Sequence, residues 1–180
     1  MTNDEPWAFD GPPSEPSAYE LSHVSRHKPT QNAVILALDC SSTMIGWVVY
    51  DDAARDHGEI KLPGSDLALR CKRAFASVGL IIETHPDIDC VAIESLVARF
   101  AKAVIPQACV HGAVLTRIAL FGLHAIEVTP GQAKRQLTSM GDANKGEMRA
   151  AALVYGVEGE HASDALGIAL FAASRVKVVA

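Results

Sequence analysis

The sequence AVILALD, residues 33–39, is an unbroken apolar run that ends on one acidic residue, Asp39. Such a run is typical of a strand that is buried on both faces of a sheet. A polar turn separates it from IGWVVYDD at 45–52, and the turn DAARDHG at 52–58 leads into the half-polar run HGEIKLP at 57–63. Three strands joined by tight turns form an antiparallel meander, so we expect the sheet to begin with antiparallel pairing.

The rest of the chain alternates helices with strands, which predicts parallel pairing in that half of the sheet. Capping boxes mark two helix starts, Thr129 with Gln132 and Asn144 with Glu147. The predicted elements are a helix over 65–84 with Ser65 as its N-cap, a buried strand at 89–94, a helix that begins near Pro106 and ends before Gly122, a strand at 123–128, and three helices that begin at Pro130, after Asn144 and near His161. We therefore predict an α/β fold with a mixed five-stranded sheet flanked by helices.

The composition indicates one globular domain preceded by a tail. The 180 residues are 49% hydrophobic and 21% charged, which excludes a disordered, collagen-like or coiled-coil chain. Residues 1–32 are rich in Pro, Ser, Glu and Asp, so we expect a mobile acidic tail there and a single domain over 33–180. No apolar stretch is long enough for a membrane span and the start lacks a secretion signal, so we expect a soluble cytoplasmic protein.

The four cysteines do not form a motif. They stand 31, 19 and 19 residues apart, at Cys40, Cys71, Cys90 and Cys109, without a CxxC pair. We therefore expect reduced thiols in the core and neither a zinc site nor disulfides.

Charge is distributed unevenly along the chain, although the net charge is −5. Residues 33–98 hold ten acidic and five basic side chains, whereas residues 99–149 hold seven basic and three acidic ones. The net charge disfavours a nucleic-acid partner. Binding follows the local field, however, so the basic segment permits a polyanion to lie near carboxylates from elsewhere in the chain.

Two carboxylates stand at the predicted ends of buried strands. Asp39 ends the first strand, and Glu94 ends the strand at 89–94. If these strands are neighbours, both carboxylates project from the same edge of the sheet, where functional groups gather in α/β folds. Like charges this close repel by several kcal/mol unless a cation lies between them, so a divalent-metal site would resolve the arrangement.

A third carboxylate and an imidazole come from the last predicted helix. Asp164 lies in its first turn, and His161 lies three residues earlier on the same face. Carboxylate oxygens suit Mg²⁺ or Mn²⁺, and an imidazole favours Mn²⁺ somewhat. The four residues also have simpler interpretations: a turn-forming role for Asp39, a solvent-reaching strand end for Glu94, and a dipole-stabilised helix start for the other two.

Four blocks of sequence, in this order and spacing, resemble the RuvC-type Holliday-junction resolvases of the ribonuclease H superfamily. They are LALDCSSTMIGWVV, VAIES, VTPGQAKRQLTSMGDANKGEM and HASDALGIAL. The resemblance runs from about Ala33 to Ser174 and leaves out the tail. It implies a ribonuclease H-like fold and a homodimer, from a bacterial cell or a phage-infected host, that cuts two opposed strands of a four-way DNA junction.

The resemblance also implies the chemistry of the site. Carried over by position, the ligands of two Mg²⁺ ions per subunit are Asp39, Glu94, His161 and Asp164, with Mn²⁺ able to substitute. The family uses aspartate or histidine at the third of these positions, so His161 fits the pattern. Hydrolysis by two metal ions leaves 5′-phosphates and needs no nucleotide cofactor and no membrane.

Four basic side chains are candidates for contacts with the DNA. Lys145 matches a lysine that the family keeps at this helix start, where its charge would act at the scissile phosphate. Lys134 matches a second family lysine, and with Arg135 and Arg149 it is expected to contact backbone phosphates. The alternative for all four is a solvated side chain on an exposed helix face.

One stretch departs from the family pattern. The resembled enzymes have an aromatic shortly after the second acid that stacks on bases at the strand exchange point. Here Ser95, Leu96 and Val97 follow Glu94, and the nearest aromatic is Phe100. Aliphatic side chains can also unstack base steps, so the resemblance leaves the substrate range open to forks, flaps and other branched DNA.

The helix at 106–121 is apolar on more than one face. This predicts either a dimer interface, as in the resembled enzymes, or a central helix buried within the monomer.

Two other function classes compete with the nuclease. An actin-like phosphotransferase shares the first strand and turn but needs a second domain, for which 180 residues leave no room. A catalytically silent nucleic-acid-binding scaffold would have no reason to keep the repelling carboxylates together.

Overall fold

The structure, a computed structural model, describes residues 33–97 and 101–176. The predicted tail at 1–32 and the aromatic Phe100 lie outside the described residues. None of the helices within these two ranges combines the length and hydropathy that a bilayer crossing requires.

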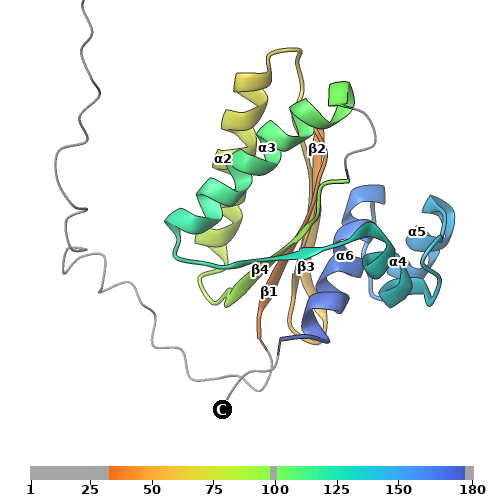
Figure 1. Cartoon of the computed structure of the whole chain (residues 1–180). Helices are drawn as coiled ribbons and strands as arrows, with labels where there is room; N and C mark the ends of the chain where they lie inside the picture. Colours follow the sequence, from red (N-terminus) through yellow and green to blue (C-terminus); the bar gives the residue numbers. More distant parts are fainter. Residues whose placement is uncertain (1–32, 98–100, 177–180) are drawn as a thin grey trace, which may run out of the picture.

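Five strands of the described residues form one mixed sheet in the order β3-β2-β1-β4-β5 (Figure 1). β2 pairs antiparallel with β1 and with β3, whereas β4 pairs parallel with β1 and with β5. The strands are β1 (Ile35–Cys40), β2 (Met44–Tyr50), β3 (Ala54–Lys61), β4 (Cys90–Glu94) and β5 (Ala125–Val128). The predicted meander and the parallel second half of the sheet are confirmed.

Helices cover both faces of this sheet (Figure 1). α2 and α3 pack together on one face, and α4, α5 and α6 lie on the other. Alternate residues of β1 serve the two layers: Leu36 and Leu38 belong to the core under α2 and α3, whereas Ile35 and Ala37 belong to the core under α6. The helices are α2 (Leu67–Thr84), α3 (Ala101–Leu120), α4 (Pro130–Thr138), α5 (Lys145–Leu153) and α6 (Glu160–Ala173).

The predicted capping boxes are present at the starts of α4 and α5. The backbone N–H of Thr129 donates to Oε1 of Gln132 at 2.9 Å, and the Thr129 side chain accepts from the Gln132 N–H. Asn144 and Glu147 make the same reciprocal pair, with the Asn144 N–H donating to Oε2 of Glu147 at 2.7 Å. These bonds satisfy N–H groups that have no partner inside their helices, so both helix starts are fixed locally.

The hairpin between β2 and β3 differs from the prediction. β3 begins at Ala54, so most of the predicted turn DAARDHG is strand. An edge strand tolerates polar side chains on both faces because one side of it meets water. Val49 pairs with Asp56, but Tyr50 pairs with Ala54, so β3 holds one extra residue at this point. This β-bulge decides which of the later residues in β3 face each side of the sheet.

Two helix starts also differ from the prediction. The N-cap of α2 is Asp66 and not Ser65, since the Asp66 carboxylate accepts hydrogen bonds from two N–H groups of the first turn. α3 begins at Ala101, so Pro106 lies inside the helix and not at its start. Proline at this position cannot donate the helical hydrogen bond to the carbonyl four residues earlier, but α3 still packs against α2.

The cysteines are free thiols at different depths. Cys40 is buried as predicted, and burial beside acidic side chains raises the pKa of its thiol well above the usual value. Cys71 and Cys90 are half-buried, and Cys109 is exposed. The prediction of core thiols is therefore wrong for Cys109, which lies on a face of α3 that the protomer does not cover.

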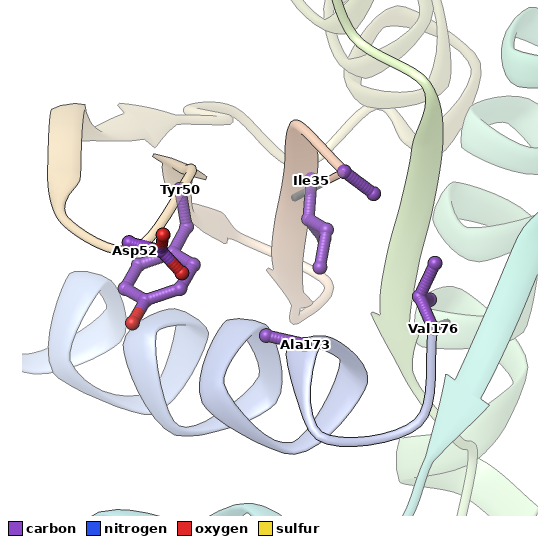
Figure 2. Close-up of a pocket in the computed structure, with 6 residues that line it drawn as sticks. Ile35, Tyr50, Asp52, Ala173 and Val176 are labelled. Carbon is purple, nitrogen blue, oxygen red and sulfur yellow. The ribbon is translucent and has the colours of Figure 1, made fainter. Parts of the chain in front are cut away.

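A small pocket lies at the N-terminal end of β1, the end away from Asp39 (Figure 2). Ile35 at the start of β1 and Tyr50 at the end of β2 line it together with Ala173 at the end of α6. Its volume is about 30 Å³, which holds no more than a few water molecules. The pocket is too small for a substrate, and the candidate site residue Asp39 lies near the other end of β1.

Leu166→Ala tests the packing of α6 on the sheet. Leu166 is completely buried, so its truncation is expected to destabilise the fold by about 2–5 kcal/mol. Leu80→Ala is the matched control in α2, because Leu80 is 61% exposed and its truncation should change stability by no more than about 0.5 kcal/mol. Urea unfolding followed by circular dichroism measures both, and equal losses would contradict the assigned core.

Candidate active site

One row of residues crosses three strands near the carboxyl end of β1. Asp39 pairs with Gly46 of β2, and Gly46 pairs with Glu59 of β3. Residues in register project to the same face of a sheet. Asp39 and Glu59 therefore face the same layer of helices, on either side of a residue that has no side chain.

His161 lies over this row, in the first turn of α6. Its ring Nδ1 is 2.7 Å from Oδ2 of Asp39, and its backbone N–H donates to Oε1 of Glu59 at 2.8 Å. A Cβ on Gly46 would overlap the backbone of His161. Glycine at this position therefore allows α6 to approach β2 closely enough for both contacts.

Glu94 and Asp164 complete the group of titratable side chains. Glu94 ends β4, which is the parallel neighbour of β1, and Asp164 follows His161 on α6. Burial, together with the charges of Asp39 and Asp164, raises the pKa of Glu94 to about 8. Burial and the charge of Asp39 also raise the pKa of Asp164 to about 6. The three carboxyl groups thus lie within electrostatic reach of one another.

The same negative charges favour the charged form of the imidazole, whereas they disfavour the charged forms of Glu94 and Asp164. The hydrogen bond to Asp39 raises the pKa of His161, and the surrounding carboxylates add to this effect against the cost of burial. The protonated ring is favoured beside a carboxylate because opposite charges stabilise each other. His161 is therefore held to Asp39 both by its ring and by the position of its helix.

The donor set suits a hard divalent cation. A cation would favour the ionised forms of Glu94 and Asp164, whose raised pKa values reflect burial and repulsion. Within 33–97 and 101–176, no three His, Cys, Asp or Glu side chains are already arranged as a metal-binding group. Nδ1 of His161 is engaged by Asp39, so Nε2 is the ring nitrogen left to bind a cation.

The turn after Asp39 is formed by a different residue. Oγ of Ser41 accepts a hydrogen bond from the Met44 N–H at 2.9 Å, and the Ser41 N–H donates to the Met44 carbonyl at 2.8 Å. The Asp39 side chain points instead to His161. The interpretation of Asp39 as a turn-forming residue is therefore wrong.

Two polar side chains of α3 hold the strand ends from the other face of the sheet. Nε2 of Gln107 donates to the carbonyl of Cys40 at 2.9 Å, and Nε2 of His111 lies 3.2 Å from the carbonyl of Glu94. His111 is only 4% exposed. Sequence reasoning missed this pair, although two polar residues four positions apart in an apolar helix are a usable signal.

Lys134 is the basic residue whose charge reaches the acids most clearly. It is half-buried on α4, and its charge opposes the rise in the pKa of both Glu94 and Asp164. The charge of Lys134 therefore acts on both carboxyl groups.

The other predicted basic residues are exposed. Lys145, the first residue of α5, is exposed and forms an ion pair with Glu160, the first residue of α6. Hydrogen bonding to Glu160 raises the pKa of Lys145 and lowers that of Glu160. Arg135 is exposed on α4, and Arg149 lines a hollow of about 170 Å³ where α5 approaches α6.

Two further residues of the site were not predicted. Gly46 offered a signal, because a glycine inside an apolar strand often marks a close backbone approach. Glu59 offered none, because its orientation depends on the bulge in β3 and its partner lies 102 residues away.

Comparison with known proteins gives consistent sequence matches. The family model described as crossover junction endodeoxyribonuclease RuvC matches residues 35–172. RuvC of Burkholderia multivorans is 30% identical over 148 residues, which cover 76% of this chain and 81% of that protein. RuvC of Chromohalobacter salexigens is 25% identical over 146 residues, with 76% and 78% covered.

Solved structures share the fold. Thermus thermophilus RuvC in complex with a Holliday junction substrate matches with a TM-score of 0.68 and 24% identity, over 79% of this chain and 94% of that chain. The yeast mitochondrial Holliday junction resolvase matches with a TM-score of 0.57 and 10% identity, over 86% and 87%. These likenesses confirm the predicted ribonuclease H-like arrangement of sheet and helices. With the family match over most of its length, this chain belongs to the RuvC family of crossover junction endodeoxyribonucleases.

Proposed function

We propose that this chain is a structure-selective endonuclease that resolves four-way DNA junctions by metal-dependent hydrolysis. One observation carries the proposal: Asp39, Glu94, His161 and Asp164 gather at one edge of the sheet in a member of a crossover junction endodeoxyribonuclease family. The Holliday junction in the complex of the Thermus relative supports the same substrate class. We assign the activity to a single domain over residues 33–180, acting on DNA in the cytoplasm of a bacterial cell or a phage-infected host.

The same four residues would hold two Mg²⁺ ions per subunit, with Mn²⁺ as a substitute. Divalent cations, when bound, activate water for in-line attack on the phosphodiester and stabilise the departing 3′ oxygen, which leaves a 5′-phosphate. The raised pKa values of Glu94 and Asp164 support the assignment, because a nearby cation allows buried carboxylates to ionise together at neutral pH.

A contact between two of the ligands orients the site, and nearby basic side chains neutralise the substrate. Asp39 fixes the ring of His161 through Nδ1, and the buried ends of β1 and β4 keep the carboxylates in place. Lys134 supplies a positive charge beside the acids, where negative charge builds up on the scissile phosphate. Lys145 is free to exchange the exposed carboxylate of Glu160 for a phosphate oxygen when DNA arrives.

Helices α4 and α5 provide the surface on which the DNA backbone lies. Lys134 and Arg135 come from α4, and Arg149 comes from α5. Together with Lys145 they gather positive charge beside the acids, in a chain whose net charge is negative. Such contacts position the duplex without reading its sequence.

Residues 95–97 take the place of the aromatic wedge of related enzymes. Val97 is 51% exposed just beyond β4, so it can reach a base step. An aliphatic side chain unstacks bases but offers little surface for stacking. We therefore expect forks and flaps to be cut as well as four-way junctions.

An uncharged face of α3 is assigned to pairing with a second copy of the chain. Ile105 is 59% exposed and Leu120 is 68% exposed. Cys109, Gly112 and Thr116 are exposed between them on the same helix face, and the Thr116 hydroxyl is bonded back to the Gly112 carbonyl at 2.8 Å. The protomer leaves this face open, which disfavours the interpretation of α3 as a wholly buried central helix. A two-fold pairing would cover it in both copies at once.

Asp39→Asn and Glu94→Gln are each expected to abolish cutting of a synthetic four-way junction in Mg²⁺ or Mn²⁺, because each removes a charged ligand at nearly constant size. Junction binding, measured by gel shift, should survive. Glu127→Gln on the exposed side of β5 is the control and should cut like the wild type.

The same assay should include a flap, a fork, plain duplex and EDTA. Strong cutting by either acid variant, or by the wild type in EDTA, would contradict the proposed metal site. A wild-type chain that binds junctions but never cuts them would instead be the catalytically silent scaffold.

Lys134→Ala is expected to weaken junction binding and to reduce the slope of log K against log salt by about one, since one phosphate contact is lost. Lys72→Ala is the control, because Lys72 is exposed on α2, which covers the opposite face of the sheet. Fluorescence anisotropy at several salt concentrations measures the slope. An unchanged slope would show that Lys134 does not contact a phosphate and is only a solvated lysine.

Ile105→Asp is expected to convert a dimer to monomers, because a buried unpaired carboxylate at the paired α3 faces is costly. Leu80→Asp, at an equally exposed position of α2, should leave the dimer intact. Sedimentation velocity distinguishes the two species. A monomeric wild type, or a dimer that tolerates Ile105→Asp, would contradict this interface.

A further inference from the structure

The N-terminus of α6 lacks a cap of its own. Gly159 occupies the N-cap position with φ of 105° and has no side chain to accept a hydrogen bond. The first N–H groups of a helix have no partner inside it and need an outside acceptor. That acceptor comes from the edge strand, because the His161 N–H donates to Oε1 of Glu59 at 2.8 Å.

The edge strand β3 also contacts the segment before α6 at a second point. The backbone N–H of Glu158 donates to Nε2 of His57 at 3.2 Å. His57 and Glu59 are two residues apart on β3 and so project to the same face. A Cβ on Gly159 would lie 2.7 Å from Oε1 of Glu59. Two features therefore favour glycine at position 159: its positive φ, and the lack of room for a side chain beneath the Glu59 carboxylate.

The residue held by Glu59 is also a proposed metal ligand. The backbone of His161 is bound to Glu59 and its ring is bound to Asp39, on opposite sides of Gly46. Asp164 lies on the same helix less than one turn later. Any shift of the first turn of α6 therefore moves both His161 and Asp164 relative to Asp39 and Glu94.

We infer that Glu59 is a positioning residue: its carboxylate caps α6 from the edge strand and thereby fixes His161 and Asp164 in the geometry that the site requires. The inference rests on the proposed function for its consequence, but the cap itself is a property of the chain. Glu59 acts on His161 in two ways: its oxygen holds the His161 backbone, and its charge contributes to the raised pKa of the ring. The cap depends on an oxygen at the right reach, whereas the effect on the ring depends on the charge.

Three substitutions of Glu59 separate reach from charge. Glu59→Gln keeps an oxygen acceptor at the same reach without the charge, Glu59→Asp keeps the charge but withdraws the oxygen by one methylene, and Glu59→Ala removes both. Glu127→Ala on β5, the opposite edge strand, is the matched control. If the cap is the function, Gln resembles the wild type and Asp resembles Ala.

The first readout is hydrogen exchange of the His161 amide in the full chain in EDTA, followed by NMR. Exchange should be about tenfold faster in Glu59→Ala and Glu59→Asp, as expected for the loss of one ordinary hydrogen bond, and unchanged in Glu59→Gln and Glu127→Ala. The second readout is Mn²⁺ binding by calorimetry, where the same two variants should bind about tenfold more weakly. Junction binding in EDTA should stay constant.

The third readout is the Mn²⁺ concentration at half-maximal cutting, which should rise by the same factor in Glu59→Ala and Glu59→Asp. A Glu59→Gln variant that behaves like Glu59→Ala would overturn the inference, because charge and not capping would then matter. Unchanged exchange and Mn²⁺ affinity in Glu59→Ala would overturn it as well. The first two readouts do not depend on cutting, so an inactive wild type would count against the proposed function alone.

Discussion

Repulsion among three carboxyl groups at one half-buried edge of the sheet is the constraint on which the rest of the site depends. Burial and neighbouring negative charge raise the pKa of Glu94 to about 8 and that of Asp164 to about 6. Such groups ionise together at neutral pH only when positive charge joins them. The chain supplies some of that charge itself, through the His161 ring and the Lys134 ammonium group. The remaining deficit is the reason for assigning divalent cations to this edge in the proposed function.

Both helical layers brace the strands that carry these groups. A strand end leaves carbonyl groups beyond its ladder without strand partners, and buried carbonyls need a donor. Gln107 and His111 of α3 supply that contact on one face of the sheet. On the other face, α6 is fastened to β1 through Asp39 and to β3 through Glu59. The acids are therefore carried by regular elements that are held on two sides and not by loops.

Features that follow from local pattern could be predicted from the sequence, and features that join distant residues could not. The buried strand β1 and the two capping boxes are local, and the structure contains them. The start of α2 was misplaced because Ser65 and Asp66 are both good N-caps, and only packing chooses between them. Pro106 resembled a helix start because proline favours the first turn. The contact of Glu59 with His161 needed the strand register, which a one-residue bulge sets.

That bulge also bears on how the hairpin can evolve. It lies between the Gly46–Glu59 pair and the tip of the hairpin, so it can absorb one gained or lost residue near the tip. The part of β3 nearer the acids then keeps the same residues on each face of the sheet. A length change on the other side of the bulge has no such buffer, and it would swap the polar and apolar sides of the strand. Natural variants of this hairpin should therefore differ in length at the tip while the spacing from the bulge to Glu59 stays constant.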